Sequence, residues 1–127
     1  MHLALLDESK RSRYNTGSIL KRETEGECMF ESKLKNESVD LLAKAFLSLR
    51  DEEECYRLFE DLFTIKEIQD LSSRMVVALM LSQKATYSEI VEKTRTSTAT
   101  IGRVNRALNY GAGGYERVIE RLKGTDK

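Results

Sequence analysis

The stretch from Thr94 to Leu108, TRTSTATIGRVNRAL, combines groups that could bind a polyanion with little side-chain bulk. Hydroxyl residues and an alanine make up most of its first half, and two arginines share its second half. Hydroxyl groups and free NH groups at a helix N-terminus can hydrogen-bond to phosphate. Small side chains let a helix approach base edges in a major groove about 12 Å wide, where threonine offers a hydroxyl and a methyl group. The candidate DNA-binding residues are Ser97, Thr98, Ala99, Thr100, Gly102, Arg103 and Arg106.

The net charge of zero hides an uneven distribution along the chain. Residues 36–83 carry 5 basic and 10 acidic side chains, whereas residues 84–123 carry 8 basic and 4 acidic ones. Lys84, Lys93 and Arg95 lie close in sequence to the candidate contacts. A locally basic surface can hold phosphate through counterion release. The alternative is that these are ordinary solvated charges on helices.

Two short predicted helices would position this stretch. Thr86 and Glu89 fit a capping box, which starts a helix over residues 87–94. A tight turn and a second helix then complete a helix-turn-helix at about residues 87–108, in which the first helix braces the second against the core. The residues expected to face inward are Ile90, Val91, Ile101, Val104 and Leu108.

Three further helices are predicted upstream. Ser38 is placed as the N-cap of the first, the DEEE run at Asp51 favours the start of the second rather than a metal cluster, and Thr64 with Glu67 forms a capping box for the third. The apolar face of the third helix is wider than a small monomer needs, and packing against a partner subunit is one way to bury it. The expected faces are Val39, Leu42, Ala45, Phe46 and Leu49; then Cys55, Leu58, Phe59 and Leu62; then Ile65, Ile68, Leu71, Met75, Val76, Ala78, Leu79, Met80 and Leu81.

The composition predicts an all-α protein of about six helices, because the chain has no proline, seven glycines and a charged fraction of 33%. A closing helix follows the loop NYGAGGY. Residues 1–35 show no sustained period and are predicted to be a flexible arm, or an extension that precedes a natural start at Met29. Residues 36–123 would form one domain and residues 124–127 a tail. The closing helix should bury Tyr115, Val118, Ile119 and Leu122.

The inventory of reactive side chains argues against catalysis. His2 is the sole histidine, and Cys28 and Cys55 have no second cysteine at metal-ligand spacing. A zinc site or a Cys/His nucleophile is therefore excluded, and Cys55 is expected at or near a helix face of the core. No apolar run approaches the roughly 18 residues that span a bilayer. We expect a cytoplasmic, non-enzymatic protein with no membrane partner.

A family resemblance covers about residues 39–122. It rests on LRDEEECYRLFEDLFTIKEIQDL, SSRMVVALML and TYSEIVEKTRTSTATIGRVNRALNYGAGGY, which resemble the tryptophan repressor family and its YerC/YecD-type branch. STATIxRVxRxLNYG is a specific signature, and FEDLxTxxEIxDL accompanies it upstream. The resemblance implies an interlaced, Trp repressor-like homodimer that presents two recognition helices to successive major grooves of a near-palindromic operator in double-stranded DNA.

The resemblance also implies roles for two groups of residues. Thr98, Ala99 and Gly102 correspond to base-facing positions, and Thr100 corresponds to a phosphate-contacting one. The residues that match the family's tryptophan pocket are Thr64, Arg74 and Arg103.

Four positions depart from the family pattern. Val104 replaces a glycine beside the indole pocket, and Ala107 replaces a serine near the amino group of the ligand. Losing a buried polar partner costs about 1 to 3 kcal/mol, so tryptophan binding should be weak. Ser88 stands where the repressor has a base-contacting arginine. Arg95 occupies a turn position where relatives prefer glycine, and we expect that turn to be built differently because a left-handed arginine has a steric cost.

Three hypotheses follow. The first is a dimeric, sequence-specific transcriptional regulator, a repressor that needs no tryptophan and no cofactor. The second keeps the fold and adds a small carboxylate corepressor, tryptophan or another, held by Arg74 and Arg103, although these arginines could instead pair with carboxylates of residues 51–70. The third is a helical adaptor that binds protein rather than DNA, supported by Ser88 and the neutral total charge.

Overall fold

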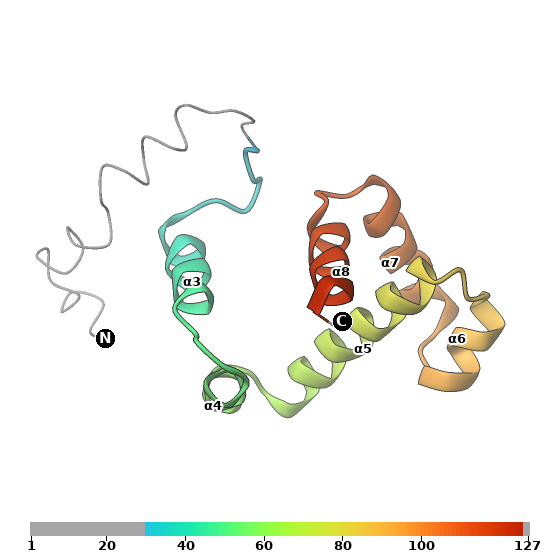
Figure 1. Ribbon diagram of the computed structural model, residues 1–127, viewed down its shortest axis with the longest axis horizontal. Helices are drawn as coiled ribbons and strands as arrows, with labels where there is room; N and C mark the ends of the chain where they lie inside the picture. Colours follow the sequence, from blue (N-terminus) through green and yellow to red (C-terminus); the bar gives the residue numbers. More distant parts are fainter. Residues whose placement is uncertain (1–29, 126–127) are drawn as a thin grey trace, which may run out of the picture. The chain divides into compact units, whose positions relative to one another are not determined.

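The computed structural model describes residues 30–125 and places six α-helices and no strand in them. The all-α prediction is therefore confirmed for this part of the chain. The chain divides after Ser48 into two compact units, so the first helix belongs to one unit and the other five to the second. The helices, drawn in Figure 1, are α3 (Glu37–Leu47), α4 (Glu52–Leu62), α5 (Ile65–Ser82), α6 (Tyr87–Thr94), α7 (Thr98–Tyr110) and α8 (Gly114–Thr125).

The predicted domain boundaries stay predictions. Residues 1–29, with Cys28, His2 and the alternative start at Met29, lie outside the described residues. The predicted domain of residues 36–123 spans both units. At its C-terminal end, α8 continues through Thr125, two residues beyond the predicted end of the domain.

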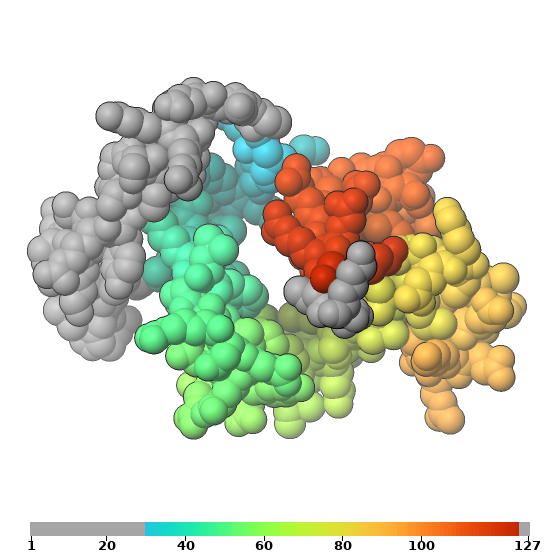
Figure 2. Space-filling model, in the orientation of Figure 1, coloured from blue at the N-terminus to red at the C-terminus, as the bar shows by residue number. Residues whose placement is uncertain are grey.

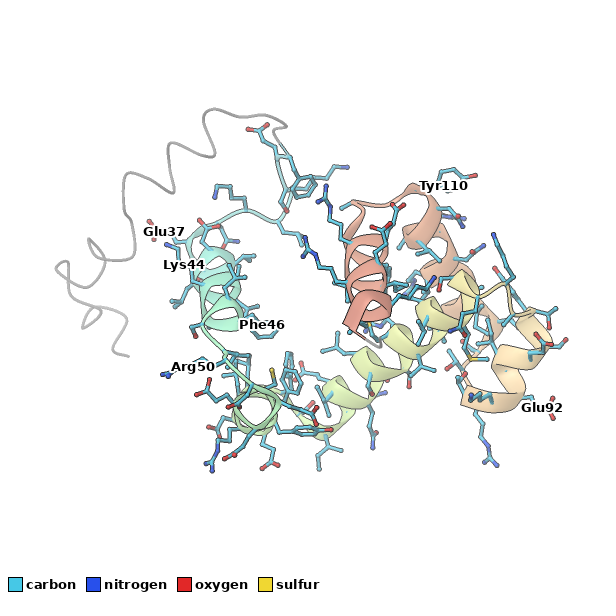
Figure 3. All side chains as sticks on the ribbon, in the orientation of Figure 1. Glu37, Lys44, Phe46, Arg50, Glu92 and Tyr110 are labelled. Atoms are coloured by element: carbon cyan, nitrogen blue, oxygen red, sulfur yellow. The ribbon has the colours of Figure 1, made fainter. Side chains whose placement is uncertain are left out.

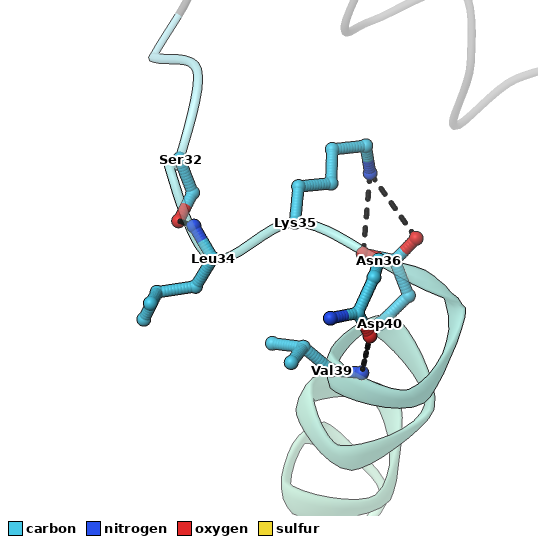
Figure 4. Close-up of polar contacts among 6 residues, drawn as sticks. All are labelled: Ser32, Leu34, Lys35, Asn36, Val39 and Asp40. Atoms are coloured by element: carbon cyan, nitrogen blue, oxygen red, sulfur yellow. Dashed lines mark hydrogen bonds and ion pairs between the residues drawn. The ribbon is translucent and has the colours of Figure 1, made fainter.

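The N-terminal end of α3 corrects one predicted cap. Asn36, whose backbone is extended, accepts a hydrogen bond from the backbone NH of Val39 at 2.9 Å, so Asn36 and not Ser38 is the N-cap. Ser38 already lies inside the helix and could not cap it. Lys35 Nζ lies 3.2 Å from each carboxylate oxygen of Asp40 and adds an ion pair across this first turn, as Figure 4 shows.

The second and third predicted helix starts are confirmed. Asp51 accepts from the NH of Glu54 at 2.9 Å at the start of α4. At the start of α5, Thr64 accepts from the NH of Glu67 at 3.1 Å, and Glu67 accepts from the NH of Thr64 at 2.9 Å. These are the reciprocal bonds of a capping box, which satisfy NH groups that have no partner within the helix.

The apolar faces of α3 and α4 are left largely uncovered. Neither helix has a buried residue, and Leu42 on α3 is 41% exposed. Cys55 on α4 is half-buried rather than part of the core. Leu49, predicted on the face of α3, lies two residues beyond its end. Within residues 30–125, both helices are thus regular and amphipathic but contain no buried residue.

The core lies between α5, α6, α7 and α8. Its fully buried side chains are Val77 and Ala78 from α5, Ile90 from α6, Ile101 and Val104 from α7, and Ile119 from α8. Val77 is missing from the predicted face of α5, whereas Val76, which was included, is 43% exposed. Every position from Met75 to Leu81 is apolar, so the spacing alone could not select the side that packs.

The closing helix buries less than predicted. Ile119 is 3% exposed and Tyr115 is half-buried, but Val118 and Leu122 are 44% and 48% exposed. The prediction that all four lie inside is therefore wrong for Val118 and Leu122, because α5 and α7 cover only one side of α8. None of the helices in residues 30–125 is long and apolar enough to cross a bilayer, and those residues hold no cluster of three metal-binding side chains.

Candidate nucleic-acid interface

The helices α6 and α7 form the predicted helix-turn-helix. Glu89 NH and Thr86 Oγ1 lie 3.2 Å apart, and Thr86 NH donates to Glu89 Oε2 at 2.7 Å, so the second predicted capping box is confirmed. Three residues, 95–97, separate the two helices. Ile90 and Ile101 are both fully buried and anchor the pair to the core that they share with α5. In Figure 2, α6 and its flanking turns lie at the edge of the second unit.

The turn between these helices is built on a left-handed arginine. Arg95 has φ 59 and ψ 19, so our expectation of a different turn is wrong. Its NH donates to the carbonyl of Val91 at 2.8 Å. Thr94 Oγ1 donates to the carbonyl of Ile90 at 2.7 Å and accepts from the NH of Thr96 at 3.1 Å. These neighbouring bonds hold the backbone in a conformation that glycine usually adopts.

The second helix of this motif, α7, has two faces of different character. Ile101 and Val104 are 0% and 2% exposed and hold it to the core. A Cβ added to Gly102 would meet nothing within 4 Å, so packing within the chain does not require glycine there. Glycine in a helix interior costs about 1 kcal/mol relative to alanine, which makes its presence here informative. The remaining predicted contacts are exposed or half-exposed: Ser97, Thr98, Ala99, Thr100, Arg103 and Arg106.

Two of the predicted contacts also shape the helix itself. Ser97 is the N-cap of α7, because its Oγ accepts from the NH of Thr100 at 3.2 Å. The hydroxyl groups of Ser97 and Thr100 lie 3.1 Å apart. The Thr98 hydroxyl makes no hydrogen bond to residues 30–125, so it remains available to an outside partner. The first NH groups of α7 are likewise free of helical partners.

The predicted ligand pocket of Thr64, Arg74 and Arg103 stays a prediction. Arg74 and Arg103 are exposed on α5 and α7, and in residues 30–125 neither lies within ion-pair distance of a carboxylate. The alternative that they pair with carboxylates of residues 51–70 is thus not observed. Thr64 precedes Arg74 by ten residues, which is about 15 Å along a helix. Within the chain, Thr64 serves as the cap of α5.

The surroundings of Ala107 are apolar. A shallow depression of about 430 Å³ lies beside it, between the end of α7, the loop that follows, α5 and α8. Val104, one turn earlier on α7, is part of the core, so its isopropyl group fills space that a glycine would leave open. The lining residues are Met75, Ala107, Ala112, Gly114, Tyr115 and Val118.

Several structural features of this region were not predicted from the sequence. Lys84 has φ 68 in the turn before α6. Asn109 Nδ2 donates to both oxygens of Asn105, the carbonyl at 2.8 Å and the side chain at 2.9 Å, on the later part of α7. Glu92 on α6 and Tyr110 at the end of α7 project outward in Figure 3. The interruption of the helical period at residues 82–86 is the signal that could have located the turn at Lys84.

Comparisons with known proteins agree with this architecture. The family profile for Trp repressor protein matches residues 37–123. The uncharacterized protein YerC of Bacillus subtilis (strain 168) is 51% identical over 94 residues, which cover 74% of this chain and 90% of that protein. A TrpR like protein from Eubacterium eligens ATCC 27750 superposes with a TM-score of 0.69 at 57% identity, over 72% of this chain and 94% of that one. A candidate Trp repressor from Staphylococcus aureus superposes with a TM-score of 0.68 at 44% identity, over 72% and 91%.

Proposed function

Because the chain belongs to the Trp repressor protein family, whose members are DNA-binding regulators, we propose that it is a sequence-specific transcriptional regulator. It binds a near-palindromic operator as a homodimer, through the helix-turn-helix α6–α7, and acts as a repressor. Binding does not depend on tryptophan.

The observation that carries this proposal is the division of α7 into two faces. Ile101 and Val104 fix one face to the core, and the opposite face carries little side-chain bulk around Gly102. A helix with such small side chains on its outer side can bring its backbone close to base edges in the major groove. Arg103 and Arg106 on the exposed side add positive charge, and each phosphate contact would steepen the salt dependence by about 0.9 log units per log unit of salt.

The uncovered apolar faces support the homodimer. Leu42 and Val39 on α3 are 41% and 37% exposed, and Leu71 on α5 and Val118 on α8 are 40% and 44% exposed. Large apolar surfaces of this kind mark interaction sites in soluble proteins. In this family the helices of two subunits interlace, and a second copy of the chain would cover these faces. A dimer would also place two copies of α7 one helical turn of DNA apart.

Tryptophan independence is supported by two side chains. Val104 fills the core where the family has a glycine beside the indole. Ala107 offers a methyl group beside an apolar depression where the family has a serine near the amino group of the ligand. An ammonium group left without a polar partner in such surroundings costs about 1 to 3 kcal/mol or more.

The proposal is tested by in vitro selection of duplexes from a random library with the full-length protein. We expect enrichment of a near-palindromic sequence whose half-sites are about 10 base pairs apart, centre to centre. Repeating the selection with 1 mM tryptophan, chosen as roughly the level that would saturate a micromolar site, should leave affinity unchanged. Failure to enrich any sequence would overturn the proposal and would favour the helical adaptor, whereas a tenfold gain with tryptophan would overturn only the tryptophan independence.

A second candidate function adds a small carboxylate ligand. It is favoured by Arg74 and Arg103, because both guanidinium groups are exposed and neither is paired with a carboxylate in residues 30–125. A thermal-shift screen of amino acids and small carboxylates tests it. A true ligand at 100 times its dissociation constant would stabilise the protein by roughly 2.7 kcal/mol, and the gain should vanish in Arg74→Ala.

A further inference from the structure

Two residues of the helix-turn-helix region hold a backbone conformation that disfavours their side chains. In residues 30–125, Lys84 and Arg95 are the only non-glycine residues with positive φ, at 68° and 59°. Left-handed backbone is sterically costly for residues with a Cβ, and glycine is the usual choice. Both residues are cationic, and they flank α6 on its two sides.

The turn at Lys84 is a Schellman motif. The NH of Ala85 donates to the carbonyl of Met80 at 3.1 Å, and the NH of Lys84 donates to the carbonyl of Leu81 at 3.0 Å. Lys84 therefore occupies the C′ position after α5, where glycine is strongly preferred. Ala85 and Met80 both pack against the core and complete the motif. The motif uses the backbone of Lys84 and leaves its ammonium group unused.

The turn at Arg95 likewise makes no use of its side chain. The backbone NH of Arg95 and the hydroxyl of Thr94 make the bonds that hold this turn. The guanidinium group is exposed, as is the ammonium group of Lys84. Neither cation lies within ion-pair distance of a carboxylate in the described part of the chain, although Glu89 and Glu92 stand on the helix between them.

A side chain on left-handed backbone costs conformational energy, and neither cation pairs with a carboxylate in residues 30–125. Their presence at these two positions therefore indicates a binding partner outside the chain. In a helix-turn-helix the first helix crosses the sugar-phosphate backbone, so the turns at its two ends lie near phosphates. We propose that Lys84 and Arg95 form a phosphate clamp, in which one cation from each end of α6 binds a phosphate of the operator. This inference rests on the proposed function and assigns a partner to two residues beyond α7.

The clamp is tested with glycine variants of the full-length protein, K84G and R95G. Each removes a cation from a left-handed position and relieves the steric cost of the side chain, while the unfolded chain gains entropy. We therefore expect Tm to stay the same or to rise. Each lost contact should lower the slope of log affinity against log salt by about 0.9 per protomer, which is about eightfold in affinity at 0.1 M salt.

Three further variants separate charge from backbone. R95N keeps a residue that tolerates left-handed backbone but has no charge, and it should behave like R95G. R95K keeps the charge and should bind within about threefold of the wild type, because a phosphate contact needs chiefly a cation. Lys66→Gln is the matched control, since it removes one positive charge on α5 that already pairs with Asp70 at 3.3 Å.

The outcomes distinguish this inference from the proposed function. If the wild type binds the selected duplex and K84G and R95G bind it with the same affinity and salt slope, only the clamp is overturned. If the affinity of Lys66→Gln falls as far as that of R95G, the effect is one of net charge and the clamp is likewise overturned. If the wild type binds no duplex at all, the proposed function fails, and the clamp fails with it.

Discussion

The helices α3 and α4 and the four helices that follow them are equally regular but differ in what they bury. Asn36 and Asp51 cap α3 and α4 as firmly as Thr64 and Thr86 cap α5 and α6. Yet α3 and α4 bury no residue, whereas α5–α8 share a core of six. Local capping and apolar spacing are therefore sufficient to define a helix. The burial of its side chains depends on which other helices pack against it.

The largest expected effect lies in the shared core. Ile101→Ala removes most of a fully buried side chain between α5 and α7, and it should lower the free energy of unfolding by about 2 to 4 kcal/mol. Urea denaturation at fixed protein concentration measures this loss. Leu47→Ala on α3 is the matched control, because Leu47 is 85% exposed, and its loss should stay within about 0.5 kcal/mol. Equal losses of unfolding free energy in the two variants would contradict the difference in burial between the two regions.

The second largest effect concerns the exposed apolar face of α3, which a second copy of the chain should cover. Leu42→Asp places a carboxylate on the apolar side of α3, and burying that charge without a partner is strongly unfavourable. Sedimentation should find the wild type at twice its 14.6 kDa mass and Leu42→Asp shifted towards the monomer, with at least a 100-fold weaker association. Lys44→Asp, which puts the same carboxylate on the charged side of α3, should remain dimeric. A wild type that is monomeric at all concentrations would contradict the dimer.

The smallest effect on stability concerns Gly102. Gly102→Ala adds a methyl group that meets nothing within 4 Å, so it should raise stability by about 0.5 to 1 kcal/mol through helix propensity. On an outer face that enters a groove, the same methyl group should weaken DNA binding. Thermal unfolding and a duplex titration on one sample measure both. Stabilisation without any loss of affinity would mean that α7 does not approach DNA at Gly102.

Much of this architecture could be predicted from the sequence, because the signals are local. The capping boxes at Thr64 and Thr86 and the start at Asp51 are each decided by residues three apart. The burial of Ile101 and Val104 follows from their helical spacing.

The features that could not be predicted from the sequence have a different physical origin. The choice of Val77 over Val76 on α5 depends on which side the neighbouring helices take, as does the exposure of Val118 on α8. The left-handed backbone at Lys84 and Arg95 contradicts the local preference of both residues. Such positions are set by packing and by the turn's hydrogen bonds, which no short window of sequence contains.

The central claim is that α6 and α7 bind a specific operator, and a duplex titration across salt tests it most directly. The selected duplex and a shuffled one are titrated with full-length protein between about 50 and 200 mM salt. We predict that affinity for the selected duplex falls steeply and linearly on logarithmic axes, and that it exceeds affinity for the shuffled duplex by about 10³ or more. Affinity that is flat with salt and equal for both duplexes would contradict the account.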